Sequence, residues 1–557
     1  MNKFTLLLLL LIGLNGAGRL TAQVLDSTFG YHFLNYLTFT YFGQRADYLA
    51  DALFLPDGKF LLAGTSLALD RSAALAMVRL RPNGQYDLSF GQWGHLLLPL
   101  GRFADSCLVA VLQGADRVLM GGFTRETPQS REKLLLVRTH IQGQLDTTFG
   151  TRGQVIIDLP GETEWISEIV VLPDAKILIG GTMAYGIKWS PNWLVADSSR
   201  IFVGRLLPNG QVDSTFGQGG FFYASLSQAC TVSSLGDMLV DPKGRIWIGG
   251  YPGLFFAQCV EGEYTTRILR YLPNGQPDAS FGTHGTRVIF SRSGVSTRYY
   301  QAAVQLFHLD SDGRLLVIGQ EELDKLLMAR LWAEDGRLDS SFANRGIYFA
   351  RTRPLSRIPD WKSIIRIGNH YYLSSESSNG GHGAYVARFR LEGVLDSAFG
   401  GPFLWPYFMY VLFQVENEGG FGSLSVKIHP TSDSSGFYLY GTKFSSVHYL
   451  NDMFIGKVRL TDASVSAGEV ISHAGLLLYP NPAPSGGRVF FSAEGQPAPA
   501  EPLLLQLTDM QGRLLHRQSY ALAEGINEIS LPPLPPGAYV FSLTGAQGRW
   551  VQKLLVR

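Results

Sequence analysis

The sequence predicts an all-β fold: a seven-bladed β-propeller of four-stranded units of about 60 residues, followed by a small antiparallel β-sandwich. A short phrase of Asp, two further residues, Phe and usually Gly occurs seven times, at steps of 57 to 67 residues. An apolar hairpin with a tight turn recurs between the phrases, also seven times. The 63 Gly, 24 Tyr and 34 Phe in 557 residues suit turns and strands better than helices. Four short strands repeated at this period are typical of a propeller.

The N-terminal segment, residues 1–22, has the features of a secretory signal peptide. Lys3 supplies a basic start, Leu6 to Leu14 are mostly apolar, and Thr21-Ala22 is a small-residue cleavage site. No later stretch has the roughly 20 uninterrupted apolar residues of a spanning helix. We therefore expect an exported chain without a transmembrane anchor.

The repeated phrase supports two interpretations. Seven carboxylates could hold metal or act in acid and base chemistry, but catalytic carboxyl pairs lie within about 5 to 10 Å of each other, and the copies fall in different units. A turn needs one Asp per unit, so we expect each Asp to accept backbone N–H bonds and each Phe to anchor the turn in the core. The Asp and Phe residues are Asp26 and Phe29, Asp87 and Phe90, Asp146 and Phe149, Asp213 and Phe216, Asp278 and Phe281, Asp339 and Phe342, and Asp396 and Phe399.

The remaining elements of a unit are a hairpin, a third strand and a fourth apolar run. In the first unit the hairpin turn is Leu55-Pro-Asp-Gly58, where Pro and Gly suit the two corners. An Arg recurs near the end of each third strand, and we expect it to pair with the phrase Asp rather than to form a functional ring of cations. These residues are Arg79, Arg138, Arg205, Arg270, Arg330, Arg388 and Arg459.

The two ends of the array predict ring closure. The first phrase, Leu25 to Gly30, precedes the first hairpin, whereas the last unit stops near Leu460 without a phrase of its own. We therefore expect the N-terminal segment to complete the last unit and to remove an exposed sheet edge.

Residues 24 to 461 resemble the delta-60 repeat family, whose units carry the same phrases as Pro82-Asn-Gly84, Asp87-Leu-Ser-Phe90-Gly91 and Leu55-Pro-Asp-Gly58-Lys59. The resemblance implies a propeller-like β repeat over residues 23–463 and no particular enzymatic reaction. Ala343 replaces the phrase Gly, and Pro-Asn-Gly is missing before Asp146.

The candidate ligand-binding residues lie in a long loop. The hairpin turns and Asp phrases emerge on one face of the propeller, so the other face carries the variable loops that usually bind ligands. The longest, Thr182 to Arg200, contains Tyr185, Trp189, Trp193 and Asp197. Aromatic rings beside a polar group could bind a sugar or a peptide side chain; alternatively the rings cover a neighbouring blade.

Composition excludes several classes of function. A net charge of +1 without long runs of one sign does not favour nucleic acid. No catalytic, cofactor-binding or metal-ligand motif occurs in an interpretable context, so we expect no cofactor and no metal. Cys230 and Cys259 fall in one unit, and both a disulfide and two separate thiols are compatible with the sequence.

The C-terminal segment is a separate β module, residues 474–557, after a linker at residues 464–473. It resembles the C-terminal sorting domain of the type IX secretion system in Tyr479-Pro480-Asn481-Pro482, Gly512, Gly537, Tyr539 and Lys553. The resemblance implies interaction with the type IX secretion machinery and a protein secreted or attached to the outer surface of a Gram-negative cell. A carbohydrate-binding sandwich is the alternative.

These observations predict a secreted or surface-displayed propeller that binds or scaffolds an extracellular glycan or protein. The alternative is a glycosidase or lyase with its site on the variable-loop face. Converging acidic side chains near the propeller axis would favour the enzyme.

Overall fold

The structure is a computed structural model of the chain, and it has two compact units, Met1–Thr461 and Asp462–Arg557. The residues that it describes contain strands and turns and no helix. They are residues 23–26, 28–30, 37–40, 42, 45–190, 193–226, 232–251, 264–292, 303–322, 325–351, 361–375, 385–396, 399, 424–445, 450–460, 476–479, 485–493, 503–509, 514–521, 526–535, 537–545 and 548–556. The predicted signal peptide, the linker, Cys230, Cys259, Pro480, Asn481, Pro482 and Gly512 lie outside these residues.

The strands of the first unit form antiparallel sheets in chain order. The first two sets of four, joined by a single parallel bridge between Ala73 and Ala104, are β3 (Ala46–Phe54), β4 (Phe60–Leu67), β5 (Ala73–Leu80), β6 (His95–Leu98), β7 (Ala104–Gln113), β8 (Arg117–Arg125), β9 (Lys133–His140) and β10 (Gln154–Ile157). The next sheet holds β11 (Thr163–Val171), β12 (Ile177–Tyr185), β15 (Ser198–Leu206) and β16 (Phe221–Ala224), with a separate hairpin of β13 (Lys188–Ser190) and β14 (Trp193–Val195).

The later sheets repeat the same order. They contain β17 (Ser234–Val240), β18 (Ile246–Tyr251), β19 (Tyr264–Tyr271) and β20 (Thr286–Arg292), then β21 (Ala303–Leu309), β22 (Arg314–Glu322), β23 (Lys325–Trp332) and β24 (Ile347–Arg351), then β25 (Trp361–Ile367), β26 (His370–Ser375) and β27 (Tyr385–Arg390). Residues 400–423, where the sequence predicts a fourth strand beside β27, lie outside the described part. The last sheet holds β1 (Gln23–Leu25), β2 (Leu37–Thr40), β28 (Leu424–Pro430), β29 (Gly436–Ser445) and β30 (Leu450–Leu460).

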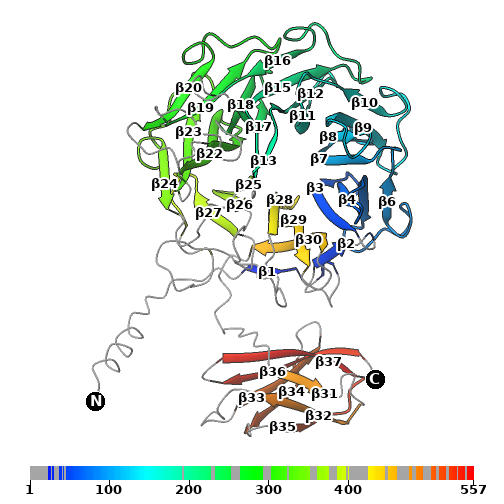
Figure 1. The fold of residues 1–557 in the computed structure, drawn as a ribbon. Helices are drawn as coiled ribbons and strands as arrows, with labels where there is room; N and C mark the ends of the chain where they lie inside the picture. The colour runs from blue at the N-terminus through cyan, green and yellow to red at the C-terminus, as the bar shows by residue number, and fades with distance from the viewer. Residues whose placement is uncertain are drawn as a thin grey trace. The chain divides into compact units, whose positions relative to one another are not determined.

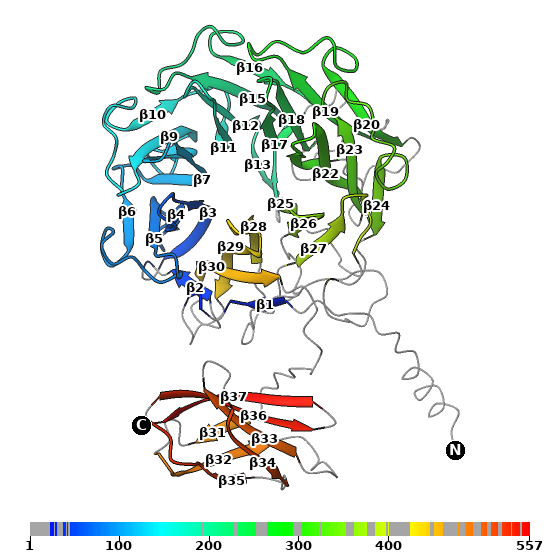
Figure 2. The same ribbon diagram turned by 180° about the vertical axis from the view of Figure 1, so that it is seen from behind.

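The sheets are arranged as in a propeller, around a central opening (Figures 1 and 2). The first strand of each set lies nearest the centre, and the short fourth strands lie at the rim. Clusters of buried apolar side chains fill the space between neighbouring sheets; one of them joins Leu178 of β12 to Leu235 of β17. The core is thus a series of interfaces between successive sheets.

Each phrase forms a turn that is hydrogen-bonded to its own strand. In the second copy, Asp87 Oδ1 accepts the Ser89 N–H at 3.2 Å, and Arg79 Nε donates to Asp87 Oδ2 at 2.9 Å. The Arg79 guanidinium lies over the Phe90 ring, 4.7 Å from its centroid. The same Arg–Asp bond, at 2.7 to 2.9 Å, joins Arg138 to Asp146, Arg205 to Asp213, Arg270 to Asp278, Arg330 to Asp339 and Arg388 to Asp396.

In most of the described copies the phrase also joins its sheet to the next, and we call this contact the inter-sheet joint. Arg205 Nη1 donates to the Pro273 carbonyl of the following sheet at 2.8 Å, and the Gly217 N–H donates to the Asn274 carbonyl at 2.9 Å. Gly275, in the same turn, has a φ of 84°, and a Cβ there would meet the Phe216 ring at 3.1 Å. The Pro-Asn-Gly turn therefore needs its Gly for both conformation and close approach.

The N-terminal strand belongs to the last sheet, as the sequence predicts. β1 pairs with β30 in the register Gln23–Leu460 to Leu25–Val458, and Arg459 Nη2 donates to Asp26 Oδ1 at 2.8 Å. The Gly30 N–H donates to the Asn83 carbonyl of the first sheet at 2.7 Å. The N-terminal phrase is thus the inter-sheet joint between the last and first sheets. The pairing of β2 with β30 is an addition that the sequence did not predict.

The C-terminal unit consists of two antiparallel sheets. One contains β31 (Leu476–Tyr479), β32 (Arg488–Ala493) and β35 (Ile526–Ser530), and the other contains β33 (Leu503–Asp509), β34 (Leu514–Tyr520), β36 (Gly537–Gly545) and β37 (Gly548–Val556). Both sheets contribute to one cluster of buried side chains, which includes Val489 and Phe541. Strand β34 has the largely polar sequence Leu-Leu-His-Arg-Gln-Ser-Tyr, and its side chains are half-buried or exposed.

Candidate functional site

The segment with the candidate ligand-binding residues is shorter than predicted and carries its own hairpin. β12 and β15 pair as far as Tyr185 and Ser198, so both ends of the predicted loop, Thr182 to Arg200, belong to strands. Gly186, with a φ of 64°, ends the ladder. β13 then pairs with β14, Trp189 with Leu194 and Ser190 with Trp193. In projection along the ring axis the hairpin extends toward the central opening (Figure 1).

Two of the four predicted residues lie together at the base of this hairpin. The Asp197 N–H donates to the Tyr185 carbonyl at 3.0 Å, and Asp197 is exposed whereas Tyr185 is half-buried. A Cβ at Gly186 would collide with the Asp197 carboxylate, so the Gly leaves room for this acid. Trp189 and Trp193 are placed in β13 and β14 by their backbones, and their side chains lie outside the description.

Glu162, in the neighbouring β10–β11 connection, holds the hairpin base, and Glu164 of β11 bonds the same connection. Glu162 Oε2 accepts the Ile187 N–H at 3.1 Å, and the Glu162 N–H donates to the Ala184 carbonyl at 2.8 Å. Glu164 Oε1 accepts the Leu159 N–H at 2.7 Å. The orientation of the hairpin therefore depends on the strand that precedes it in the sheet.

Glu164 is buried with one carboxylate oxygen unpaired. Burial raises the pKa of Glu164 to about 7, against the hydrogen bond from Leu159. The equivalent acids in the first two sheets, Asp47 and Asp105, accept hydroxyl bonds from Ser66 and Thr124 on the adjacent strand, at 2.7 and 2.8 Å. Glu164 faces Met183 in the same register, and its Oε2 has no partner among the described residues.

A second group of charged side chains lies on the strands nearest the centre. In each of β3, β7, β11, β17, β21 and β25 the register shifts by one residue at a β-bulge. We call the residues after the bulge, with Lys427 of β28, the central ring positions: they are Asp51, Val109, Glu168, Asp237, Leu306, Ser363 and Lys427.

Several central ring side chains bond the next sheet. Asp51 Oδ2 accepts the Ala110 N–H at 3.2 Å, and Asp237 Oδ2 accepts the Phe307 N–H at 2.6 Å. Lys427 Nζ donates to Asp51 Oδ1 at 2.6 Å. These bonds give Asp51 and Asp237 a role in holding the sheets together, because a buried backbone N–H needs an acceptor.

Burial and neighbouring charges shift the pKa values of three central ring side chains. Burial raises the pKa of Asp237 to about 6 against hydrogen bonds from Phe307 and Met238. Burial and the charge of Asp237 raise the pKa of Glu168 well above its usual range. Burial alone would lower the pKa of Lys427, but the Asp51 carboxylate reverses this effect and raises it. Glu168 and Asp237 thus favour their protonated forms more than exposed acids do.

Sequence reasoning missed both groups, although a signal for the second exists. Asp51, Glu168, Asp237 and Lys427 each stand seven residues before the turn residue with positive φ, which is Gly58, Ala175, Gly244 and Ser434 in turn. Aligning the hairpins on that residue would have brought the charged positions together. For Glu164 no such signal exists, because its missing partner is defined by cross-strand register.

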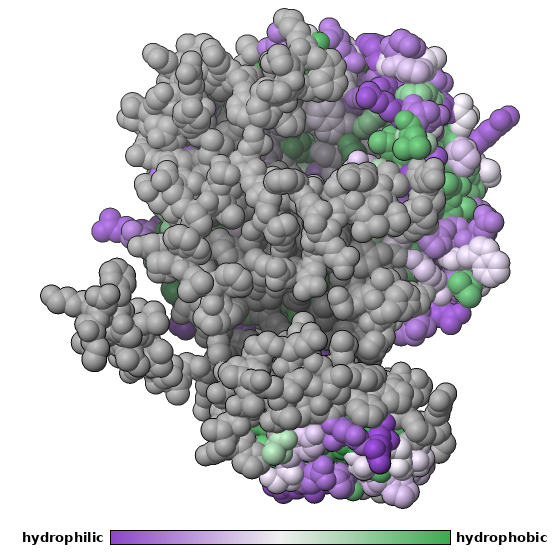
Figure 3. Space-filling model, turned by 60° about the horizontal axis from the view of Figure 1, so that its bottom comes forward, coloured by the Kyte–Doolittle hydropathy of each residue, from purple (hydrophilic) through white to green (hydrophobic). Residues whose placement is uncertain are grey.

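Outside these positions, the described surface carries both hydrophilic and apolar residues. Among the residues coloured in Figure 3, hydrophilic and apolar ones alternate over the propeller. The most exposed large apolar side chains, Leu69 at 75% and Trp93 at 71%, come from different turns. Such single side chains are ordinary on soluble proteins and do not by themselves indicate an interface.

Within the described residues, no group of three or more His, Cys, Asp and Glu side chains could hold a metal ion. A membrane-crossing helix is likewise not found in the described part of the chain. Cys107 is a buried free thiol, and burial raises its pKa.

The sorting residues that the structure describes lie in the C-terminal sheets. Tyr539 is buried in β36, and its hydroxyl donates to the Pro535 carbonyl at 2.6 Å. Gly537 begins β36, and Lys553 pairs with Val540 across β36 and β37.

Comparison with solved structures gives only distant similarity. The β-propeller domain of the trilobed protease from Pyrococcus furiosus is 9% identical over 76% of this chain and 100% of that chain, with a TM-score of 0.35. An acylaminoacyl peptidase from Pyrococcus horikoshii is 10% identical over 81% of this chain and 59% of its own length, with a TM-score of 0.36. A GH43_1 enzyme from Xanthomonas citri is 11% identical over 62% of this chain and 85% of that chain, with a TM-score of 0.27. These scores carry no argument about activity.

Family models match three segments of the chain, and no curated protein matches it significantly. The model described as a domain of unknown function (DUF5122) beta-propeller matches residues 55–90 and 244–281, which contain the hairpin turn, the third strand and the Asp phrase. Residues 477–557, which form most of the C-terminal unit, match the model of a secretion system C-terminal sorting domain. The chain therefore contains two segments similar to this β-propeller family and a C-terminal segment similar to a secretion system C-terminal sorting domain.

Proposed function

We propose that this protein is exported across the outer membrane of a Gram-negative cell by the type IX secretion system, and that its propeller acts outside the cell as a binding or scaffold module. The match of residues 477–557 to a sorting domain carries the proposal. The two-unit division supports it, because a module with its own core can be recognised, and removed, independently of its cargo.

Export is tested by deleting residues 474–557 from the chain expressed in a type IX-competent host. We expect the truncated protein to accumulate in the periplasm and the full chain to reach the surface or the medium. The matched control fuses residues 474–557 to a reporter that carries a periplasmic signal peptide; the reporter should become exported. Normal export of the truncated chain would contradict the proposal.

We further propose that the propeller has seven blades and that the C-terminal unit is a β-sandwich. The blade count is supported by the seven Asp phrases of the sequence and by treating the first eight strands as two blades that share a single bridge. The sandwich is supported by the buried cluster that both C-terminal sheets share.

The proposed binding surface is the variable-loop face around the β13–β14 hairpin. Tyr185 and Asp197 at its base, with Trp189 and Trp193 in its strands, would contact an extracellular glycan or protein. A glycan and protein binding screen of residues 23–465, compared with a variant in which residues 187–196 are replaced by a Gly-Ser turn, tests this role. Equal binding by both proteins would move the ligand site elsewhere.

A carbohydrate-active enzyme, a glycosidase or lyase, is the second candidate, and one observation favours it. Glu168 and Asp237 are carboxyl groups with raised pKa that interact near the propeller axis. A hydrolase and lyase panel tests this function, with Glu168→Gln and Leu306→Ala as the paired variants. Activity that is lost in Glu168→Gln and kept in Leu306→Ala would support the enzyme, and inactivity of the wild type would exclude it.

A further inference from the structure

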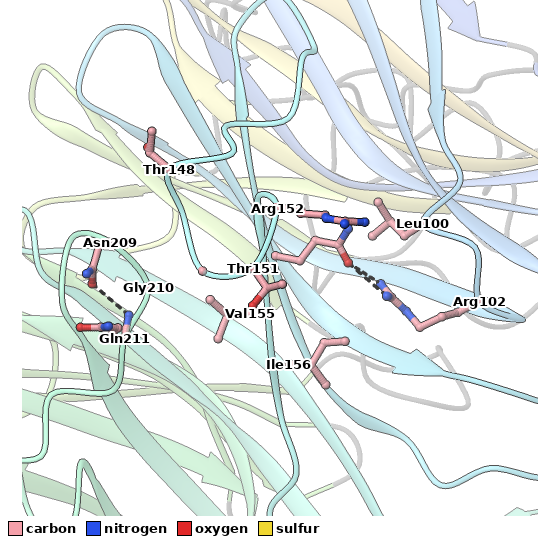
Figure 4. Close-up of a pocket in the computed structure, with 12 residues that line it drawn as sticks. Leu100, Arg102, Thr148, Thr151, Arg152, Val155, Ile156, Asn209, Gly210 and Gln211 are labelled. Carbon is pink, nitrogen blue, oxygen red and sulfur yellow. Dashed lines mark hydrogen bonds between the residues drawn. The ribbon is translucent and has the colours of Figure 1, made fainter.

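A polar groove runs along the rim where the second and third sets of strands meet (Figure 4). Its volume is about 700 Å³. It is lined by the edge strand β10, by the turn that precedes β10, by the Asn209–Gln211 turn of the next sheet and by the segment between β6 and β7. This groove is separate from the β13–β14 hairpin and from the central ring positions.

The groove presents hydrogen-bond donors and no acidic side chain. Arg102 and Arg152 line it, and Asp and Glu are absent from its lining. The carboxamide oxygen of Gln154 accepts both guanidinium Nη groups of Arg102 at 3.1 Å, and the Asn209 Oδ1 accepts the Gln211 N–H at 3.1 Å. Because these amide oxygens are engaged within the protein, the amide NH₂ groups remain available to a ligand. The Arg152 side chain is exposed and is available as well.

Arg152 occupies a conformation that an Arg does not favour. Its φ is 55°, and the equivalent turn residues Trp93, Gly219, His284 and Arg345 have φ values of 52° to 63°. A side chain in this left-handed region costs about 1 to 2 kcal/mol relative to Gly. The conformation is therefore regular for this turn, and what distinguishes Arg152 is that its exposed side chain lines the groove.

We propose that this groove binds a carboxylate-bearing saccharide, such as a run of uronic acid residues. The Arg152 guanidinium would pair with a sugar carboxylate in two parallel hydrogen bonds, since its planar fork matches a carboxylate. The amide groups of Gln154 and Asn209 would bind ring hydroxyls. Ile156, 42% exposed, and Leu100 would contact the apolar face of a sugar ring.

The geometry favours a saccharide over an acidic peptide. A peptide would bind by adding a strand to the open edge of β10, but this strand has four residues, Gln154–Ile157. In an antiparallel pair only alternate residues direct their backbone groups outward, so β10 offers about two outward N–H groups. That is too short to fix the register of an added strand.

The inference rests on the proposed binding role and is independent of the export route and of the hairpin. Isothermal titration of the mature full chain with oligogalacturonate tests it, with the fully methyl-esterified oligosaccharide as the control ligand. Arg152→Gly removes the guanidinium and suits the backbone, and we expect it to weaken binding about tenfold to a hundredfold. Arg345→Gly is the matched control, because Arg345 is exposed at the equivalent turn, with a φ of 52°.

Arg152→Gly and Arg345→Gly should both remain folded, so a loss of ligand binding can be assigned to the missing side chain. Each Gly relieves the same conformational cost, so both melting temperatures should rise and lost binding cannot reflect unfolding. Unchanged affinity in Arg152→Gly, an equal loss in Arg345→Gly, tight binding of the esterified ligand, or equal competition by polyglutamate would each overturn the proposal. If oligogalacturonate does not bind but the general screen finds another ligand, the groove proposal is rejected and the proposed binding function stands.

Discussion

Single residues in this protein occupy backbone positions that the repeat reserves for Gly. Ala343 takes the place of the phrase Gly with a φ of 45°, and Ala175 takes the place of the hairpin Gly with a φ of 62°. At the Gly91 copy of the phrase position, a Cβ would collide with the His95 carbonyl. The two Ala residues therefore store conformational energy in turns that are otherwise regular.

Replacing Ala343 by Gly should stabilise the propeller by about 1 kcal/mol, because the turn then needs no strained Cβ. Chemical denaturation of both proteins measures the difference. The control is Ala329→Gly in β23 of the same sheet, which is buried in a regular strand and should destabilise. An unchanged or lower stability of Ala343→Gly would contradict the role assigned to φ.

Glu164 makes the stability of the propeller depend on pH. Its pKa is raised from 4.5 in the unfolded chain to about 7 in the folded protein, so the folded state holds the proton more tightly. This carboxyl therefore costs almost no stability below pH 4.5; its cost accumulates as the pH rises from 4.5 to about 7 and is constant above that pH.

Glu164→Gln should be more stable than the wild type at pH 8, by on the order of 2 kcal/mol, and about equal to it at pH 4.5. Met183→Thr should reduce the same pH dependence, because it supplies a hydroxyl like those of Ser66 and Thr124. Melting curves from pH 4.5 to 8 measure both effects. Parallel curves for the wild type and Glu164→Gln would show that the buried carboxyl is not the titrating group.

At the scale of the elements, the phrase forms an inter-sheet joint. Asp213 bonds its own turn and Arg205, and Arg205 reaches the Pro273 carbonyl of the next sheet at 2.8 Å. The Phe216 ring lies under this guanidinium and against Gly275 of the same neighbouring turn. One Asp, Arg and Phe per unit are therefore explained by packing.

Arg205→Leu should destabilise the propeller by about 3 kcal/mol, because it leaves the buried Asp213 carboxylate with Lys176, 3.6 Å away, as its remaining cation. The stability of Arg205→Lys should lie between those of Arg205→Leu and the wild type, because Lys keeps the positive charge and loses the second hydrogen bond. Ligand affinity should be unchanged in both variants. A loss of affinity without a loss of stability would return the Arg residues to the list of functional groups.

At the scale of the whole molecule, contacts between the last and the first sheet join the two ends of the propeller. Asp26 bonds Arg459 of the last sheet, and Phe29 packs with Phe60 of the first, with ring centroids 5.6 Å apart. Lys427 and Asp51 add a second bond across the same boundary. The pairing of β1 also covers Val458–Leu460 of the β30 edge, which could otherwise pair between molecules.

Removing residues 23–30 should lower the melting temperature by several degrees, about 5 °C, and should promote association through the newly open edge. Replacing the same eight residues by Gly and Ser is the matched control for length, and it should cause a similar loss. Differential scanning calorimetry and light scattering measure the two effects. A melting curve identical to that of the wild type would refute this closure.

The Asp turn and its Arg partner were predictable because their groups are close in sequence and repeat, whereas the contact with the next sheet was not, because its partners, such as Arg205 and Pro273, are far apart in sequence. Asp87 and Ser89 are two residues apart, and Arg79 lies eight residues before Asp87. The hairpin within the predicted loop was not predictable in detail, since the point where the β12–β15 ladder ends depends on Gly186 and on pairing across the loop. The sequence around Glu164 and Glu168 does not indicate their raised pKa values, because burial and residues on other strands determine these values.

The sequence by itself determined the all-β class, the period of the units, the turn residues and the joining of the N-terminal segment to the last sheet. Each of these follows from local conformation and from counting repeated phrases, which need no knowledge of distant contacts. Only the tertiary structure decided which charged side chains of the innermost strands meet, which carboxyl lacks a partner and where a donor-lined groove opens at the rim. Those properties depend on β-bulges, on register between strands and on the packing of one sheet against the next, and residues more than 100 positions apart contribute to them, as Lys427 and Asp51 do.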